Sequence, residues 1–115
     1  MRAWVVAFAL GVGCVFPAMA QEFLSGFADV PLMPGLVMVE DAGIVFDSPA
    51  GRIVESYATG DVDRGSVESF YRNTLPAFGW TMREPHRFVR EEEALSLDFF
   101  GGPGGLTVRF TLAPD

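Results

Sequence analysis

Apolar side chains recur at intervals of three and four residues in one stretch of the chain, which is the spacing of a single α-helical face. The stripe consists of Val67, Phe70, Tyr71, Thr74, Leu75 and Phe78. Just before it, Asp63 or Ser66 is suited to cap the helix, because a short side chain with an oxygen accepts a hydrogen bond from a free backbone N–H. The pattern therefore predicts an amphipathic helix with one buried face.

The end of this helix is set by a proline. Pro76 has no N–H to donate to the carbonyl of Arg72, and its ring collides with that carbonyl. The regular helix is expected to finish near Leu75 and to tighten into a short turn. Gly79 then supplies a residue of left-handed conformation before Trp80. The proline is explained as the end of a helix and needs no catalytic role.

The period changes to two after Gly79, as expected of strands. Turn residues lie at Pro85-His86, at Glu91-Glu92-Glu93 and at the glycine-rich stretch 101–105. Leu95, Leu97 and Phe99 point one way along their strand, and the alternate residues point the other way. The predicted strands cover residues 80–84, 87–90, 94–100 and 106–112.

A hairpin is predicted before the helix. Residues 43–46 and 52–58 form its strands, and the Asp-Ser-Pro-Ala-Gly run at 47–51 supplies the turn. Val54, Ser56 and Ala58 share one face of the second strand, and we expect their small size to leave room for the helix. Ile53, Glu55 and Tyr57 share the other face.

The predicted element order is β-β-α-β-β-β-β, and every link between consecutive strands is short enough for a hairpin. This order predicts an α+β fold with one antiparallel sheet and a single long helix packed on one face. The domain is expected to span residues 43–115.

Residues 21–42 are expected to be irregular, because Pro31 and Pro34 fix their own backbone angles and restrict the residues before them. The segment is rich in apolar side chains that must be covered. The interpretation we favour places them across the sheet of their own domain. The alternative is that they contact a partner protein, through Phe23, Phe27, Leu32, Met33, Leu36 and Met38.

The first twenty residues have the pattern of a secretory signal peptide. Arg2 precedes an apolar stretch from Ala3 to Val15, and Ala18-Met19-Ala20 forms a small-x-small cleavage site. The apolar stretch is too short for a membrane span, which needs about 20 residues. The protein is therefore expected to be periplasmic or secreted after cleavage near Ala20. The alternative is a lipoprotein anchored through Cys14, although Leu10 lies one place too far from this cysteine for a good lipobox.

Charge narrows the choice of partners. Residues 21–115 hold seven arginines and fifteen carboxylates, a formal net charge of −8. Such a surface repels phosphate backbones, so neither nucleic acid nor an anionic membrane surface is expected to bind. Nine phenylalanines, two tyrosines and one tryptophan remain in the same residues, enough aromatic volume for one packed core.

Catalytic and metal-binding patterns are weak. His86 is the single histidine, and no serine lies in a nucleophile-elbow pattern beside it. Residues 21–115 contain no cysteine, so zinc would have one histidine and no thiolate. Asp61-Val62-Asp63-Arg64-Gly65 resembles the start of a calcium loop, yet its twelfth position is Arg72 and not glutamate. We therefore expect no catalytic residue, no metal and no cofactor.

Two further clusters have simple structural explanations. Glu91-Glu92-Glu93, with Glu84 and Asp98, is typical of a solvated connection between strands. The glycine-rich stretch 101–105 is not followed by the Gly-Lys-Ser/Thr of a phosphate loop, so it is expected to be a hairpin tip. Whether that tip contacts a partner is left open by the sequence.

The motif Phe70-Tyr71-x-x-x-Leu75-Pro76-x-x-Gly79-Trp80, followed by strands that end at Leu112, resembles small exported bacterial α+β domains of uncharacterised function, many of which are lipoproteins. The resemblance covers about residues 43–112. It implies a fold and an exported location, and it carries no functional residue.

These observations lead to an expected function. The protein is expected to be an exported, non-enzymatic accessory module that binds another envelope protein through the 23–38 segment, the outer face of the sheet, or both. The alternative is a protein that binds a small apolar ligand in a pocket between helix and sheet, lined by Tyr57, Tyr71, Trp80, Phe99 and Phe110. An enzyme is the third choice, with Glu92 and His86 as the only groups to nominate.

Overall fold

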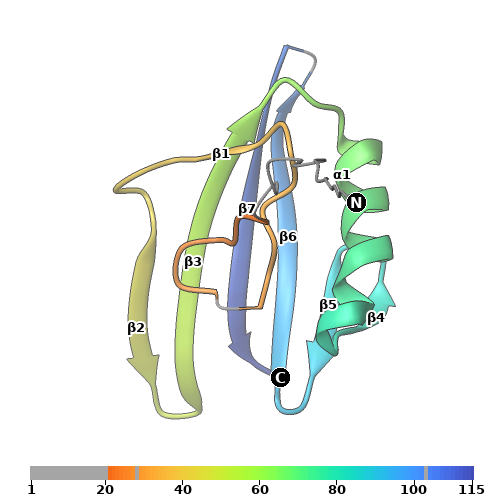
Figure 1. The fold of residues 1–115 in the computed structure, drawn as a ribbon. Helices are drawn as coiled ribbons and strands as arrows, with labels where there is room; N and C mark the ends of the chain where they lie inside the picture. Colours follow the sequence, from red (N-terminus) through yellow and green to blue (C-terminus); the bar gives the residue numbers. More distant parts are fainter. Residues whose placement is uncertain (1–20, 28, 103) are drawn as a thin grey trace, which may run out of the picture.

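The computed structural model describes residues 21–27, 29–102 and 104–115, so the predicted signal peptide at 1–20 lies outside the described residues. The fold consists of strands, one α-helix and one 3-10 turn (Figure 1). Their bounds are β1 (Val37–Met38), β2 (Ile44–Ser48), β3 (Gly51–Gly60), α1 (Arg64–Thr74), η1 (Leu75–Phe78), β4 (Thr81–Glu84), β5 (Arg87–Arg90), β6 (Glu93–Gly102) and β7 (Gly105–Pro114).

The strands form one antiparallel sheet in the order β1-β3-β7-β6-β5-β4, and β2 also pairs with β3. Because β7 takes one edge of β3, β1 and β2 lie one after the other along its opposite edge. The prediction of an α+β fold with one antiparallel sheet and one helix is confirmed. The short strand β1 is an element that the sequence pattern did not predict, because a two-residue strand leaves no periodicity to detect.

The predicted long helix is wrong in its length: α1 has 11 residues. Asp63 caps its start, where the carboxylate oxygen Oδ1 accepts a hydrogen bond of 2.7 Å from the backbone N–H of Ser66. The 3-10 turn η1 follows, with Pro76 as its second residue, and Gly79 closes it at φ +92°. The aspartate cap and the proline therefore lie too close together in the chain for a longer helix.

One face of the sheet, the inner face, holds the core. Its buried side chains come from β3, β5, β6 and β7, and the helix buries Val67, Tyr71 and Leu75 against them. The ring centroids of Tyr71 and Phe110 lie 5.4 Å apart in an edge-to-face contact, which ties α1 to β7. The buried strand residues on the inner face are Val54, Ser56, Ala58, Phe88, Leu95, Leu97, Leu106, Val108 and Phe110.

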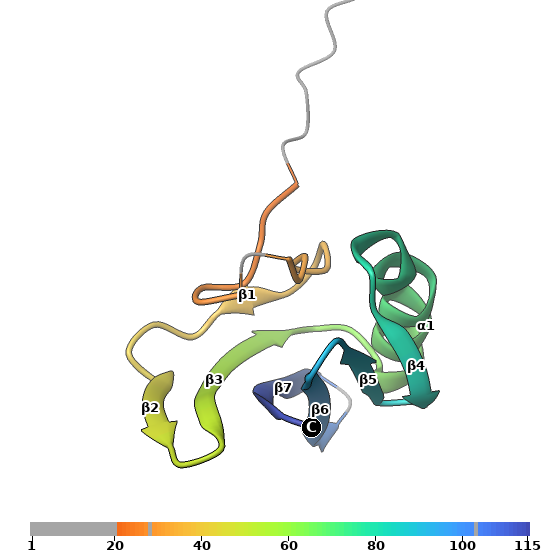
Figure 2. The same ribbon diagram turned by 90° about the horizontal axis from the view of Figure 1, so that it is seen from below.

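The N-terminal segment, residues 21–27 and 29–36, lies beside α1 on the inner face (Figure 2). Ser56 on β3 donates a hydrogen bond of 2.9 Å to the carbonyl of Ser25. A Cβ at Gly60 would collide with the carbonyl oxygen of Gly35, so backbone approaches backbone there. The small residues of β3 therefore make room for the N-terminal segment. The expectation from the sequence that they make room for the helix was wrong. Leu24, Phe27, Val30, Leu32 and Leu36 are buried in the common core.

The Tyr71 hydroxyl links α1 to the N-terminal segment, and these are the two parts of the chain that cover the inner face of the sheet. It donates a hydrogen bond of 2.8 Å to the carbonyl of Pro31 and accepts one of 3.2 Å from the backbone N–H of Met33. Burial raises the pKa of Tyr71 above its ordinary value, and the hydrogen bond from Met33 opposes this rise. The neutral hydroxyl is therefore the form that holds the segment against the helix.

Replacing Tyr71 with phenylalanine removes both hydrogen bonds and leaves the Pro31 carbonyl and the Met33 N–H without this partner. We expect Tyr71→Phe to lower the free energy of unfolding at pH 7 by about 1–3 kcal/mol, measured by urea denaturation of residues 21–115 with circular dichroism.

The difference in the free energy of unfolding between wild type and Tyr71→Phe is expected to decrease at high pH. A raised folded-state pKa means that the stabilisation from Tyr71 is complete below the unfolded pKa of about 10 and is lost as the pH rises above it. The gap between wild type and Tyr71→Phe should therefore narrow above pH 10. A gap that stays constant from pH 7 to pH 11 would contradict this role of Tyr71.

Candidate functional site

The face of the sheet opposite the core, the outer face, is lined by the alternate residues of the same strands. Strand register places Thr59, Thr107 and Phe100 in one row across β3, β7 and β6, and Tyr57, Arg109 and Asp98 in the next row. A third row consists of Glu55, Thr111 and Ser96. Neither α1 nor the N-terminal segment packs on this side, because both belong to the core cluster of the inner face.

Large apolar side chains are exposed on the outer face. Val37 lies beside Thr59 and is 66% exposed, and Phe100, in the same row, is 45% exposed. Ile44 and Phe46 on β2 lie beside Glu55 and Ile53, and each is 48% exposed. Large apolar side chains that stay exposed on an otherwise polar face are candidates for contact with a partner protein.

Arg109 organises the centre of this face. Its guanidinium donates hydrogen bonds from Nη2 (3.2 Å) and Nε (3.4 Å) to Oδ2 of Asp98. The guanidinium carbon lies 5.1 Å from the centre of the Phe100 ring, a cation–π contact. Side-chain hydrogen bonding to Tyr57, and then to Asp98, raises the pKa of Arg109, so the charge is permanent. Tyrosine and arginine are enriched in interface hot spots, and phenylalanine is enriched in interfaces in general.

The partner-contact residues that the sequence suggested in the N-terminal segment are largely withdrawn from the surface. Phe27, Leu32 and Leu36 are 3%, 6% and 5% exposed in the core, so their assignment to a partner surface is wrong. Their apolar surface is already covered by the sheet and the helix. Met33 and Met38 are partly buried against the same core, and only Phe23 is exposed.

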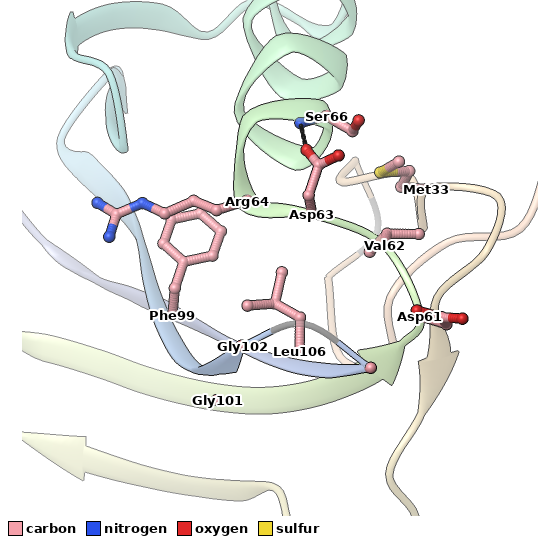
Figure 3. Close-up of a pocket in the computed structure, with 11 residues that line it drawn as sticks. Met33, Asp61, Val62, Asp63, Arg64, Ser66, Phe99, Gly101, Gly102 and Leu106 are labelled. Atoms are coloured by element: carbon pink, nitrogen blue, oxygen red, sulfur yellow. Dashed lines mark hydrogen bonds between the residues drawn. The ribbon is translucent and has the colours of Figure 1, made fainter.

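A cleft of about 700 Å³ lies between the start of α1 and the β6–β7 hairpin (Figure 3). Phe99 and Leu106 form its apolar floor, and the guanidinium of Arg64 lies over Phe99, 4.7 Å from the ring centre. Nε of Arg64 is 3.2 Å from the carboxylate of Glu68. The remaining lining residues are Met33, Asp61, Val62, Asp63, Ser66, Gly101, Gly102 and Gly104.

This cleft is not the pocket that the sequence predicted. Tyr71, Trp80 and Phe110 are buried in the filled core, and Tyr57 lies on the outer face. Of the five predicted residues only Phe99 borders the cleft. The prediction was wrong because it grouped aromatic residues without separating the two faces of each strand, although strand alternation would have set Tyr57 apart.

The groups nominated for catalysis are not brought together. His86 lies in the turn between β4 and β5, where its backbone carbonyl accepts a hydrogen bond of 3.0 Å from Leu97. Glu91 and Glu92 lie in the turn at the opposite end of β5. In the residues that the structure describes, no group of three or more His, Cys, Asp and Glu side chains gathers in a metal-binding arrangement.

Sequence reasoning missed the residues that define the outer face and the cleft. The exposed Phe46 and Phe100 were counted only as aromatic volume, and Arg64 and Arg109 only as charge. An apolar residue out of phase with the buried residues of its strand, as Phe100 is with Leu95, Leu97 and Phe99, was the signal that could have found the outer face.

Comparisons with protein-family models, with curated proteins and with solved structures found no match. Across residues 21–27, 29–102 and 104–115, no helix is long and apolar enough to cross a membrane.

Proposed function

We propose that the protein is an exported, non-enzymatic accessory module that binds another envelope protein through the outer face of its sheet. The observation that carries the proposal is the exposure of Val37, Ile44, Phe46 and Phe100 on the outer face, each between 45% and 66% exposed, around a polar centre at Arg109. The signal-peptide pattern of residues 1–20 supports the exported location, and the resemblance to small exported bacterial domains agrees with it.

Binding through this face is favoured by its composition. Apolar corners surround a centre in which Arg109 is already oriented by Asp98 and Phe100, so little conformational entropy is lost when a partner arrives. Threonine side chains at positions 59, 107 and 111 keep the middle of the face flat and supply hydroxyl groups. The acidic net charge of residues 21–115 favours a protein partner with a neutral or basic surface.

Photo-crosslinking tests this proposal. With benzoylphenylalanine in place of Phe100, we expect a discrete adduct with one envelope protein in cells, identified by mass spectrometry. The same group at Asn73, an exposed position on α1, should give no such adduct. Adding Thr107→Glu should lower the Phe100 adduct about tenfold, because an unpaired carboxylate is costly in an apolar interface. Equal labelling from both positions, or an adduct indifferent to Thr107→Glu, would contradict the proposal.

The cleft favours a second candidate, the binding of a small apolar ligand. Its volume of about 700 Å³ lies within the range of ligand sites, and its floor of Phe99 and Leu106 is apolar. Gly102 lines the cleft, and a Cβ there would meet no atom within 4 Å. The backbone of Gly102 therefore borders open space, and the apolar side-chain surface of the cleft comes from Phe99 and Leu106 on the inner face.

The neutral fluorophore phenylnaphthylamine provides a direct probe of this candidate. If the cleft takes apolar ligands, Phe99→Ala should weaken fluorophore binding about tenfold, because it removes part of the apolar floor. Phe100→Ala is the matched control, because it is the same change at the next residue of β6 and Phe100 does not line the cleft. No binding by the wild type, or equal binding by both variants, would rule the candidate out.

A further inference from the structure

Strand β2 is an edge strand whose outward side pairs with no other described strand. It pairs with β3 from Ile44↔Glu55 to Ser48↔Gly51, and β1 takes the other part of the same edge of β3. Figures 1 and 2 place β2 at the end of the sheet away from α1. Only alternate residues of an antiparallel strand bond to a given neighbour, so the remaining N–H and C=O groups of β2 point toward the free edge.

The side chains of this edge are apolar on both faces. Ile44 and Phe46 point to the outer face, and Val45 points to the inner face, opposite Val54. Val45 is 56% exposed, so the layer that covers the core does not reach it. Exposed edge strands usually carry several charged side chains, proline or a bulge that blocks further pairing. Within Ile44–Ser48 the only charge is that of Asp47, and the register with β3 is continuous.

Carboxylates flank the apolar centre. Glu40 and Asp41 precede the strand and Asp47 lies within it, and all three are exposed. Glu55 lies directly across from Ile44 on the outer face. Arg52 is the one nearby cation on the facing strand, paired in register with Asp47. The edge therefore combines free backbone groups, an apolar centre and acidic ends.

We propose that β2 receives an extended segment of the partner protein as an added strand. The segment carries apolar side chains at alternate positions, beside Ile44 and Phe46, and lysine or arginine at its ends, facing Glu40, Asp41 and Asp47. Backbone hydrogen bonds supply affinity, while the apolar and charged positions supply specificity. This inference rests on the proposed function, because it names the chemistry of the same partner.

A second copy of the chain fits this edge less well. Residues 21–115 carry a net charge of −8, so two copies repel each other. Pairing β2 with its own copy would also bring two sets of acidic flanks to one short interface. A partner segment with basic ends removes both costs.

A synthetic peptide is the probe. Lys-Val-Thr-Val-Thr-Val-Lys should bind residues 21–115 in a titration that extends to millimolar concentration, and amide NMR shifts should locate it at β2. The same peptide N-methylated at its internal residues should not bind, because it lacks the donors and the close approach that strand addition needs. A peptide with glutamate in place of both lysines should bind more weakly. Equal binding by all three peptides would overturn the proposal.

Two variant pairs locate the interaction on the protein. Phe46→Asp should weaken peptide binding at least about tenfold, whereas Met82→Asp, at a 41% exposed residue of the other edge strand β4, should not. Glu40→Lys should weaken binding about two- to fivefold, whereas Glu92→Lys, an equal change of charge in the β5–β6 turn, should not. Equal effects within either pair would overturn the assignment to β2, and so would a dimer of residues 21–115 that Phe46→Asp dissociates.

The proposal of strand addition at β2 can fail without the proposed function failing. Phe100 lies on β6, with β3 and β7 between it and β2, so its crosslink reports the outer face by itself. An adduct at Phe100 that survives Phe46→Asp, together with no peptide binding, overturns strand addition and leaves the proposed function standing. Absence of the Phe100 adduct overturns the proposed function.

Discussion

The fold depends on covering the inner face of a wide sheet with very little helix. An 11-residue helix spans about 16 Å, whereas a ten-residue strand such as β3 spans about 33 Å, so the helix cannot shield the whole inner face. The N-terminal segment supplies the missing half of the cover, and five of its side chains are buried in the common core. Tyr71 couples the two halves through its hydrogen bonds to Pro31 and Met33, and its ring packs against Phe110.

Because α1 and the N-terminal segment both cover the inner face, the outer face and the edge at β2 are the surfaces left exposed. The apolar side chains of the N-terminal segment are buried in the protein's own core, so they cannot also form a large docking surface. In the described chain neither α1 nor the N-terminal segment covers the outer face, and Ile44, Val45 and Phe46 are exposed at the hairpin end at β2. The apolar residues that remain exposed are therefore concentrated at places where a partner would complete the sheet, either over its face or along its edge.

Much of the fold was predictable from local rules. The cap at Asp63, the break at Pro76 and the left-handed Gly79 depend on neighbouring residues, and the structure has all three. The strands after the helix follow from strict alternation, and their predicted ranges differ from the observed ones mainly at the glycine hairpin, where Gly102 and Gly105 pair across the two strands. The expectation of a long helix was wrong although both ends were predicted, because the interval from the Asp63 cap to the Pro76 break leaves room only for the 11 residues of α1.

The binding surfaces were less predictable, because they depend on long-range pairing. Alternation within β3 separates Tyr57 from the buried face, but only the register of β3, β6 and β7 brings Tyr57 beside Arg109 and Asp98 on the outer face. The burial of Phe27 and Leu36 depends on the approach of the N-terminal segment to β3, at Ser56 and Gly60. Apolar composition alone cannot distinguish a segment that completes its own core from one that docks on a partner.

Hydrogen–deuterium exchange on residues 21–115 tests most directly whether the N-terminal segment is half of the cover. The amides of Leu24, Leu32, Leu36 and Val39 donate backbone hydrogen bonds to Val30, Glu22, Met33 and Tyr57. If the segment is integral to the core, these amides should exchange as slowly as the central amides of β3 and β7. Exchange at the rate of an unprotected chain, with β3 and β7 still protected, would contradict the account.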